Sequence, residues 1–309
     1  MQRFPVIAGP TAGGKTALAV DVALALRDRG RPGEVISADA YQIYRGMDIG
    51  TAKPTPDERK GVPHHLIDVA DPGDAFSVHD WLTRADAAIG DIRTRGGCPV
   101  VAGGTHLYIK ALMDGLFAGP GEDPALRAQL RAMPAAELRR ELERVDPAAA
   151  ARLHPNDLRR TIRAIEVFRA TGVPISAHQR QWDATPVHDD RVLVVLDWPS
   201  EAINRRINAR VRTMFDLGLV EEVRGLLEAG RLRGQAGEAL GYHQVVDHLD
   251  GRCTLDDAIE RVKIDTRRLA KNQRTWLRRL RATPGCVVID AADVPAADWC
   301  AIVMRACEA

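Results

Sequence analysis

A single N-terminal segment restricts the fold of this chain more than any other feature. A short apolar run at residues 5–8 leads directly into Gly-Pro-Thr-Ala-Gly-Gly-Lys-Thr at residues 9–16, and residues 17–26 are mostly Ala, Val and Leu. This is the G-x-x-x-x-G-K-[ST] pattern of a phosphate-binding loop, which lies between a β-strand and an α-helix. Since apolar strands of this kind are buried on both faces, we predict an α/β fold with a parallel sheet covered by helices.

The loop also predicts a ligand. Its glycines let successive backbone N–H groups point at a polyphosphate, while Lys15 adds a positive charge and Thr16 a hydroxyl for Mg²⁺. The helix that follows contributes the positive end of its dipole. The motif alone does not identify the phosphate compound, and such loops most often hold ATP or GTP. The predicted phosphate-binding residues are Gly9, Pro10, Thr11, Ala12, Gly13, Gly14, Lys15 and Thr16.

The composition excludes several classes of protein. With 309 residues and a net charge of +1, the chain has no overall field for a polyanion, so any nucleic-acid surface must be a local patch. The five cysteines lack C-x-x-C spacing, which indicates reduced thiols rather than disulfides or a zinc site. Because no signal segment or long apolar run is present, we expect a cytoplasmic protein with no membrane association.

Strand and helix patterns alternate through the first part of the chain. Helices are expected after the phosphate-binding loop, over residues 77–95 with Ser77 and Asp80 as a capping box, and from near Thr105. A long helical region is expected between the last two strands. The predicted strands are residues 5–8, 34–37, 66–69, 99–102, 192–196 and 287–289.

The pattern changes in the middle of the chain. Residues 124–181 show no strand signal, only short helical segments rich in Ala, Leu and Arg and separated by prolines. We therefore predict a core of residues 1–118 and 187–309, interrupted by an all-helical insertion domain at residues 119–186. Insertions into such cores commonly act as lids or substrate-binding arms.

Asp39 is the first candidate for the chemistry itself. It follows the second predicted strand, at the sheet edge where the phosphate-binding loop also lies. A carboxylate there can hold Mg²⁺ through water or take a proton from a nucleophile. The alternative, that Asp39 only caps the next helix, is left open by its position.

Two further candidates have the same ambiguity. Gly103-Gly104-Thr105 forms another strand-to-helix junction, where Thr105 is either a ligand for an anion or amine or simply a helix N-cap. Arg206 and Arg210 lie four residues apart on one helical face. They suit a departing pyrophosphate, although two such arginines are more often solvated.

A basic helix is expected over residues 261–281. Arg267, Arg268, Lys271, Arg274, Arg278 and Arg279 lie along it with Trp276 among them, and acidic residues occur only near its start. This bias favours contact with a nucleic-acid backbone over a solvated face. The nine histidines show no metal-ligand spacing, so no structural metal is expected.

Together these motifs closely resemble the bacterial tRNA dimethylallyltransferases, also called tRNA isopentenyltransferases. The segment at residues 46–54, Gly-Met-Asp-Ile-Gly-Thr-Ala-Lys-Pro, is especially specific. The matching segments follow the family's order over nearly the whole chain. They are residues 9–16, 37–39, 42–54, 63–68, 103–105, 107–108, 154–157, 164–167, 240–242, 266–267 and 275–278, with Lys271 and Gln273.

The resemblance implies a P-loop NTPase-like fold and a reaction that the loop alone would not suggest. The loop would hold the pyrophosphate of dimethylallyl diphosphate, and the acceptor would be N6 of the adenosine (position 37) next to the tRNA anticodon. Asp39 would accept the N6 proton, and Arg210 would help neutralise the leaving group. Thr105 would help to place the amine or bridge to the pyrophosphate. Mg²⁺ is the implied cofactor, with Thr16 and Asp39 as its protein ligands.

The implied RNA surface comprises several segments that would bind an anticodon stem-loop after the target base leaves its stack. We expect the protein to act as a monomer, with the basic helix contributing charge. The implied contact residues are Asp39, Ala40, Tyr41, Gln42, Thr105, Arg127, Arg159, Arg160, Thr161, Ile162, Arg163, Glu238, Ala239, Leu240, Gly241, Tyr242 and His243.

Three positions depart from the family pattern. Gly13 and Ala40 stand where Ser is usual, and His243 replaces a more usual Lys or Arg, which weakens one expected backbone contact at neutral pH. Three alternative functions use the same motifs. They are isopentenyl transfer to free adenine nucleotides, a small-molecule kinase, and an ATP-driven RNA-binding switch without transfer chemistry.

Overall fold

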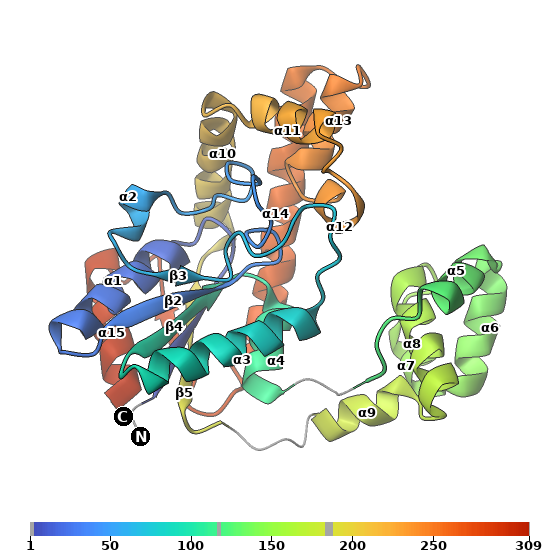
Figure 1. Ribbon diagram of the computed structural model, residues 1–309, viewed down its shortest axis with the longest axis horizontal. Helices are drawn as coiled ribbons and strands as arrows, with labels where there is room; N and C mark the ends of the chain where they lie inside the picture. The colour runs from blue at the N-terminus through green and yellow to red at the C-terminus, as the bar shows by residue number, and fades with distance from the viewer. Residues whose placement is uncertain (1–2, 116–118, 183–187, 309) are drawn as a thin grey trace. The chain divides into compact units, whose positions relative to one another are not determined.

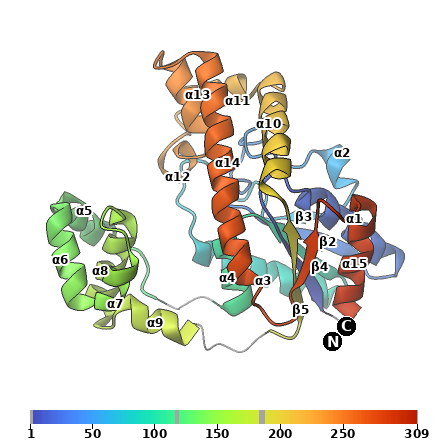
Figure 2. The same cartoon turned by 180° about the vertical axis from the view of Figure 1, so that it is seen from behind.

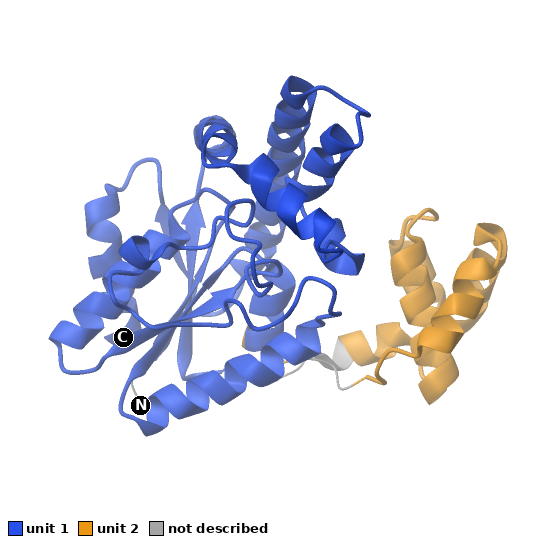
Figure 3. Ribbon diagram, turned by 45° about the horizontal axis from the view of Figure 1, so that its top comes forward, with its two compact units in different colours: residues 1–112, 188–309 blue, residues 113–187 orange. Residues whose placement is uncertain are grey.

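The computed structural model describes residues 3–115, 119–182 and 188–308. Within them the chain forms two compact units, one of residues 1–112 and 188–309 and the other of residues 113–187 (Figure 3). Of the boundary residues expected from the sequence, 118, 186 and 187 lie outside the described residues. Each unit is described separately below.

The larger unit contains one parallel sheet of six strands in the order β3-β2-β4-β1-β5-β6. All residues of β1, β2 and β4 are buried, as the apolar runs predicted. Because every strand runs the same way, the loops at the carboxyl ends meet at one edge. The strands are β1 Phe4–Ala8, β2 Gly33–Ala38, β3 His64–His65, β4 Cys98–Gly103, β5 Arg191–Asp197 and β6 Val287–Asp290.

Helices cover both faces of this sheet (Figures 1 and 2). α1 (Lys15–Asp28) and α15 (Ala296–Glu308) pack together on one face, and α3 (Val78–Thr94) and α4 (His106–Asp114) lie on the other. Ser77 and Asp80 form the predicted capping box of α3. The remaining helices of this unit are α2 Pro56–Arg59, α10 Ser200–Asp216, α11 Leu219–Glu228, α12 Gly234–Gly237, α13 Tyr242–Leu249 and α14 Leu255–Leu280.

The strand predicted at residues 66–69 is wrong. The chain pairs with β2 only through His64 and His65. Leu66 and Asp68 then adopt positive φ angles of 61° and 58°, which an extended strand does not allow. The apolar residues of this segment are used instead to pack a loop, and Asp68 turns its carboxylate toward Lys53.

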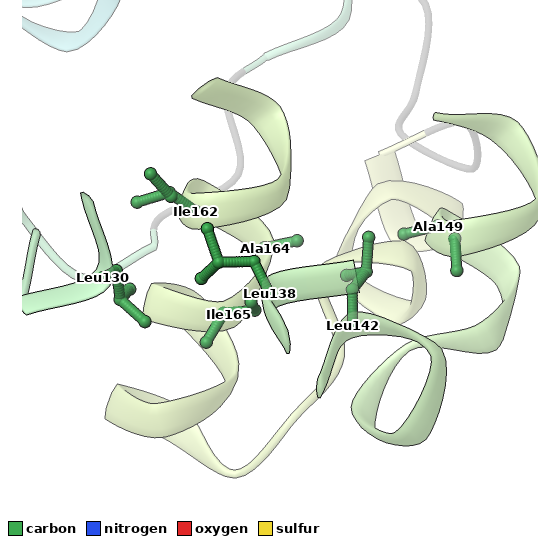
Figure 4. Close-up of a cluster of buried hydrophobic side chains, with 8 residues drawn as sticks. Leu130, Leu138, Leu142, Ala149, Ile162, Ala164 and Ile165 are labelled. Atoms are coloured by element: carbon green, nitrogen blue, oxygen red, sulfur yellow. The ribbon is translucent and has the colours of Figure 1, made fainter. Parts of the chain in front are cut away.

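The smaller unit is entirely helical in its described residues, as predicted. Asp123, Asp146 and Asp157 cap three of its helices through their side chains. Its core is a cluster of Leu, Ile and Ala side chains drawn from four of the helices (Figure 4). The helices are α5 Pro124–Ala132, α6 Ala135–Val145, α7 Pro147–Arg152, α8 Leu158–Thr171 and α9 Ile175–Trp182.

No helix within the described ranges combines the length and the apolar character that crossing a bilayer requires.

Candidate functional site

The phosphate-binding loop follows β1 at the carboxyl edge of the sheet. It closes on itself through a hydrogen bond from the Gly13 N–H to the Pro10 carbonyl oxygen (3.1 Å). Lys15 Nζ donates to the same oxygen at 2.7 Å. Ala12 has a φ of 59°, so the loop holds a non-glycine residue in the left-handed region. These contacts fix the conformation of the loop.

Three side chains from the C-terminal half of the chain hold this loop. Gln273 Oε1 accepts a hydrogen bond from the Thr11 N–H at 2.9 Å. Arg206 Nε donates to the Ala12 carbonyl at 2.7 Å, and Trp198 Nε1 donates to the Gly13 carbonyl at 3.0 Å. The Arg206 guanidinium also lies 4.8 Å from the Trp198 ring centroid. Arg206 is thus bound to the backbone of the loop.

Lys15 and Arg210 carry the positive charge of the site. Burial and the neighbouring Arg210 lower the pKa of Lys15 to about 8, although Asp39 opposes the shift. Burial also lowers the pKa of Arg210, again opposed by Asp39. Two poorly solvated cations next to each other favour binding of an anion, because an anion would relieve both costs.

Asp39 lies directly after β2 in a fixed orientation. Its Oδ1 accepts hydrogen bonds from the backbone N–H groups of Tyr41 (2.9 Å) and Gln42 (3.3 Å). Among the described residues, Oδ2 has no hydrogen-bond partner. One oxygen therefore caps the turn while the other remains to accept a proton or a hydrogen bond, so the two alternatives from the sequence are compatible.

Thr105 joins the loop after β4 to the loop after β2. Its N–H donates to the Ala38 carbonyl (3.1 Å), and its Oγ1 accepts from the Ala40 N–H (3.0 Å). Since the oxygen accepts that bond, the hydroxyl hydrogen remains as a donor. Thr105 thus fixes the segment next to Asp39 and still has a polar hydrogen to offer. We call Lys15, Asp39, Thr105 and Arg210 the reactive edge.

The donors for Mg²⁺ are few. Thr16 is exposed at the first turn of α1, and Asp39 contributes its second oxygen. The described part of the chain contains no group of three His, Cys, Asp or Glu side chains that could hold a metal. Mg²⁺ is typically bound by one or two protein oxygens together with substrate phosphates and water. These residues therefore fit a Mg²⁺ ion that arrives with a diphosphate.

The segment at residues 46–54, which we call the 46–54 loop, differs from the reactive edge because its lysine is paired within the protein. Lys53 is 4% exposed in its side chain, and its Nζ lies 2.5 Å from Asp48 Oδ1 and 2.6 Å from Asp68 Oδ1. It also donates to the Tyr44 carbonyl oxygen at 2.7 Å. A buried ammonium with three hydrogen bonds is fully used inside the protein.

Glu222 of α11 binds the backbone of the 46–54 loop. Its carboxylate accepts from the N–H groups of Asp48 (3.0 Å), Ile49 (2.8 Å) and Gly50 (3.3 Å). It also accepts from the Tyr242 hydroxyl at 2.6 Å. A Cβ atom on Gly50 would lie 2.4 Å from the Tyr242 ring, so only glycine fits there. The distinctive residue pattern of the 46–54 loop is therefore explained by how the loop packs within the protein.

Gln42 connects the 46–54 loop to Asp39. Its Nε2 donates to the carbonyl oxygens of Thr51 (3.3 Å) and Ala52 (3.2 Å), and its Oε1 accepts from Ser37 Oγ (2.9 Å). Its own N–H is one of the two that hold Asp39. The loop is thus part of the framework that orients the carboxylate.

The segment predicted to bind RNA at residues 238–243 is only partly exposed. Glu238 is exposed, whereas Leu240 and His243 are half-buried. The Ala239, Gly241 and Tyr242 residues are buried, and Tyr242 is bound to Glu222. In this conformation those three residues expose little surface that RNA could contact.

The predicted residues of the smaller unit divide in the same way. Arg159 and Arg160 are exposed, whereas Thr161 and Ile162 are buried in that unit's core. The remaining two are bound to the buried Glu166. Arg127 contacts it at 2.9 Å and Arg163 at 2.5 Å.

The basic helix was expected at residues 261–281, and the structure places it at α14. Lys271, Arg278 and Arg279 are exposed on it. Trp276 is stacked on His106 with centroids 4.5 Å apart, which places α14 beside the start of α4. The exposed cations give this helix a local basic surface in a chain that is nearly neutral overall.

Three supporting residues had no predicted role. Gln273, Trp198 and Glu222 act through contacts with residues more than 160 positions away. Of the three, Gln273 also matches the family pattern, but that match does not indicate its partners.

Comparison with known proteins identifies one family. The model of the family described as IPP transferase matches residues 42–280. A tRNA dimethylallyltransferase of Geobacillus kaustophilus is 46% identical over 282 residues, covering 90% of this chain and 88% of that protein. One from Anaeromyxobacter dehalogenans is 46% identical over 288 residues, covering 90% and 93%.

Solved structures agree with this result. The full-length tRNA isopentenylpyrophosphate transferase of Bacillus halodurans matches with a TM-score of 0.71 and 36% identity, covering 100% of this chain and 97% of that chain. A eukaryotic dimethylallyltransferase acting on tRNA matches with a TM-score of 0.83 and 28% identity, covering 99% and 78%. The chain therefore belongs to the IPP transferase family.

Proposed function

We propose that this protein transfers the dimethylallyl group of dimethylallyl diphosphate to N6 of the adenosine at position 37 of tRNA, next to the anticodon. The products are N6-(dimethylallyl)adenosine and diphosphate. The observation that carries the proposal is the reactive edge, where one oriented carboxylate lies beside two poorly solvated cations and a phosphate-binding loop. Membership of the family and the names of its relatives support the same reaction.

The loop side of the edge would bind the leaving group. The C1–O bond of an allylic diphosphate breaks easily only when the departing charge is neutralised. Lys15 and Arg210 supply that charge, and burial lowers the pKa of both, a cost that a bound anion would reduce. Since Arg206 is bound to the Ala12 carbonyl, Arg210 is the better candidate for the diphosphate.

The carboxylate side of the edge would bind the acceptor. An adenine amine is a weak nucleophile, so removing its proton as the new C–N bond forms lowers the barrier. Asp39 would accept that proton through the oxygen that its turn leaves available. The Thr105 hydroxyl would hydrogen-bond the amine or the diphosphate from the opposite loop.

Mg²⁺ would be held by the Thr16 hydroxyl and the diphosphate, and by Asp39 through a water molecule, and it would supply further positive charge there. The RNA would bind the exposed cations of α14 in the core and Arg159 and Arg160 in the helical unit. The target base would have to leave its stack to reach Asp39. We place the enzyme in the cytoplasm as a monomer that requires no membrane.

Transfer of label from radiolabelled dimethylallyl diphosphate to a synthetic anticodon stem-loop tests the proposal. We expect label in RNA that contains adenosine at position 37, and none when that base is replaced by guanosine. Digestion to nucleosides and mass spectrometry should place the added group on N6.

The alternatives give other products in the same assay. Label in free AMP without label in RNA would indicate an adenine-nucleotide isopentenyltransferase. Phosphate transfer from ATP would indicate a kinase, and RNA-stimulated hydrolysis without prenylated product would indicate a switch. Any of these results would contradict the proposed reaction.

A further inference from the structure

Gln273 makes an unusual bridge between two loops of the core. It lies on α14 with 6% of its surface exposed. Its Oε1 accepts from the Thr11 N–H in the phosphate-binding loop, and its Nε2 donates to the Gly104 carbonyl, both at 2.9 Å. Because one partner can only donate and the other can only accept, the orientation of the amide is fixed.

The neighbouring glycine is adapted to this bridge. A Cβ atom on Gly104 would lie 2.6 Å from Gln273 Nε2 and 3.6 Å from Lys15 Nζ. Any larger residue would therefore push the amide away from the loop. The two loops thus approach each other closely at the point where Gln273 joins them.

The joined loops carry the two halves of the proposed reaction. The Thr11 side continues to Lys15, which would hold the leaving diphosphate. The Gly104 side continues to Thr105, which is tied to the segment after Asp39. The relative position of these loops therefore sets the distance between the reacting carbon and the amine.

We propose that Gln273 is a positioning residue, which aligns the donor with the acceptor amine by fixing these two loops to each other. The inference rests on the proposed function. It also explains why an uncharged amide occupies this place in a basic helix, since a lysine or arginine could not accept from the Thr11 N–H.

The test compares Gln273→Ala with Gln244→Ala, which removes an equally buried bridging amide elsewhere. Gln244 accepts from the Gly241 N–H at 2.8 Å and donates to Asp265 at 3.0 Å. Both variants should lose stability by a similar amount, as thermal unfolding will show. A purely structural role therefore predicts the same kinetics for the two.

The measurement that distinguishes a positioning role from a structural one is the ratio of dimethylallyl alcohol to prenylated RNA. Water attack at C1 breaks the C1–O bond and gives dimethylallyl alcohol, diphosphate and a proton. With both substrates saturating, we expect Gln273→Ala to transfer about 10²-fold more slowly and to raise the alcohol-to-RNA product ratio about tenfold. Gln273→Glu, which keeps an acceptor for Thr11 but loses the donor to Gly104, should fall between.

The wild-type protein is measured first in the same assay. If it does not prenylate RNA, the proposed function fails. If it does, and Gln273→Ala has the product ratio of the wild type and of Gln244→Ala, the positioning role is wrong. An increase in alcohol formation confined to the Gln273 variants supports it.

Discussion

The reactive edge and the 46–54 loop are both dense in charged residues, but they use these charges in opposite ways. In the loop, Lys53 is paired with Asp48 and Asp68, and Glu222 is surrounded by four hydrogen-bond donors. At the edge, burial lowers the pKa of both Lys15 and Arg210, and the charge of Arg210 lowers that of Lys15 further. Charges balanced within the protein stabilise it, whereas unbalanced charges are available to a ligand.

The first way to test this contrast is to compare two arginines on α10. Arg210→Ala should reduce transfer by about 10²–10³-fold, because it removes charge from the developing diphosphate. Arg206→Ala removes a hydrogen bond to the Ala12 carbonyl, and we expect a loss below about tenfold. Single-turnover rates with both substrates saturating measure the difference. Equal losses in the two variants would contradict the assignment of Arg210.

The second prediction concerns the 46–54 loop. Lys53→Met should lower the free energy of unfolding by about 1–3 kcal/mol, because it leaves the buried Tyr44 carbonyl without its donor and Asp48 and Asp68 unpaired. Urea denaturation provides the measurement.

Lys60→Met is the matched control for Lys53→Met. Lys60 pairs with Asp21 at 3.1 Å on the surface, where both side chains are about half exposed. Its loss should change the free energy of unfolding by about 0–1 kcal/mol. If the two substitutions lower the free energy of unfolding by the same amount, the 46–54 loop is not held by Lys53.

The third prediction uses pH. Since the pKa of Lys15 is lowered to about 8, the unliganded enzyme keeps this charge below pH 8 and loses it above. Diphosphate binding favours the charged form, so the Kd for the donor should rise by up to about tenfold per pH unit above pH 8. Calorimetry between pH 7 and about 9.5 would show this rise. The Lys15→Met variant should bind the donor weakly, and its Kd should not rise with pH above pH 8.

The smallest expected effect is that of Tyr242→Phe. It removes one of the four donors to Glu222 and should lower the free energy of unfolding by about 1 kcal/mol. Unchanged unfolding together with weaker RNA binding would instead make Tyr242 a direct RNA contact.

Much of the fold was predictable because local patterns determine it. Five of the six predicted strands, the capping box at Ser77 and the helical stretch at residues 124–181 appear as expected. Asp39 could be placed beside the phosphate-binding loop because parallel strands bring their carboxyl ends to one edge. The displaced third strand shows the limit, since the left-handed conformations of Leu66 and Asp68 are imposed by tertiary contacts.

The supporting contacts were not predictable from local patterns. Glu222 and Gln273 reach backbone groups that are distant in sequence, and nothing nearby indicates their partners. The segment at residues 46–54 was recognised as specific, but its residue types did not reveal that Lys53 is buried. Residue type indicates which bonds a side chain can form, whereas the fold decides whether they are formed within the protein.

Single-turnover transfer to an anticodon stem-loop by Asp39→Ala tests whether Asp39 is the proton acceptor. We expect a rate about 10²–10⁴-fold below wild type, because the proton acceptor is lost. Thermal unfolding of the variant confirms that the protein is folded. Full activity in a folded Asp39→Ala protein would contradict the role assigned to the reactive edge.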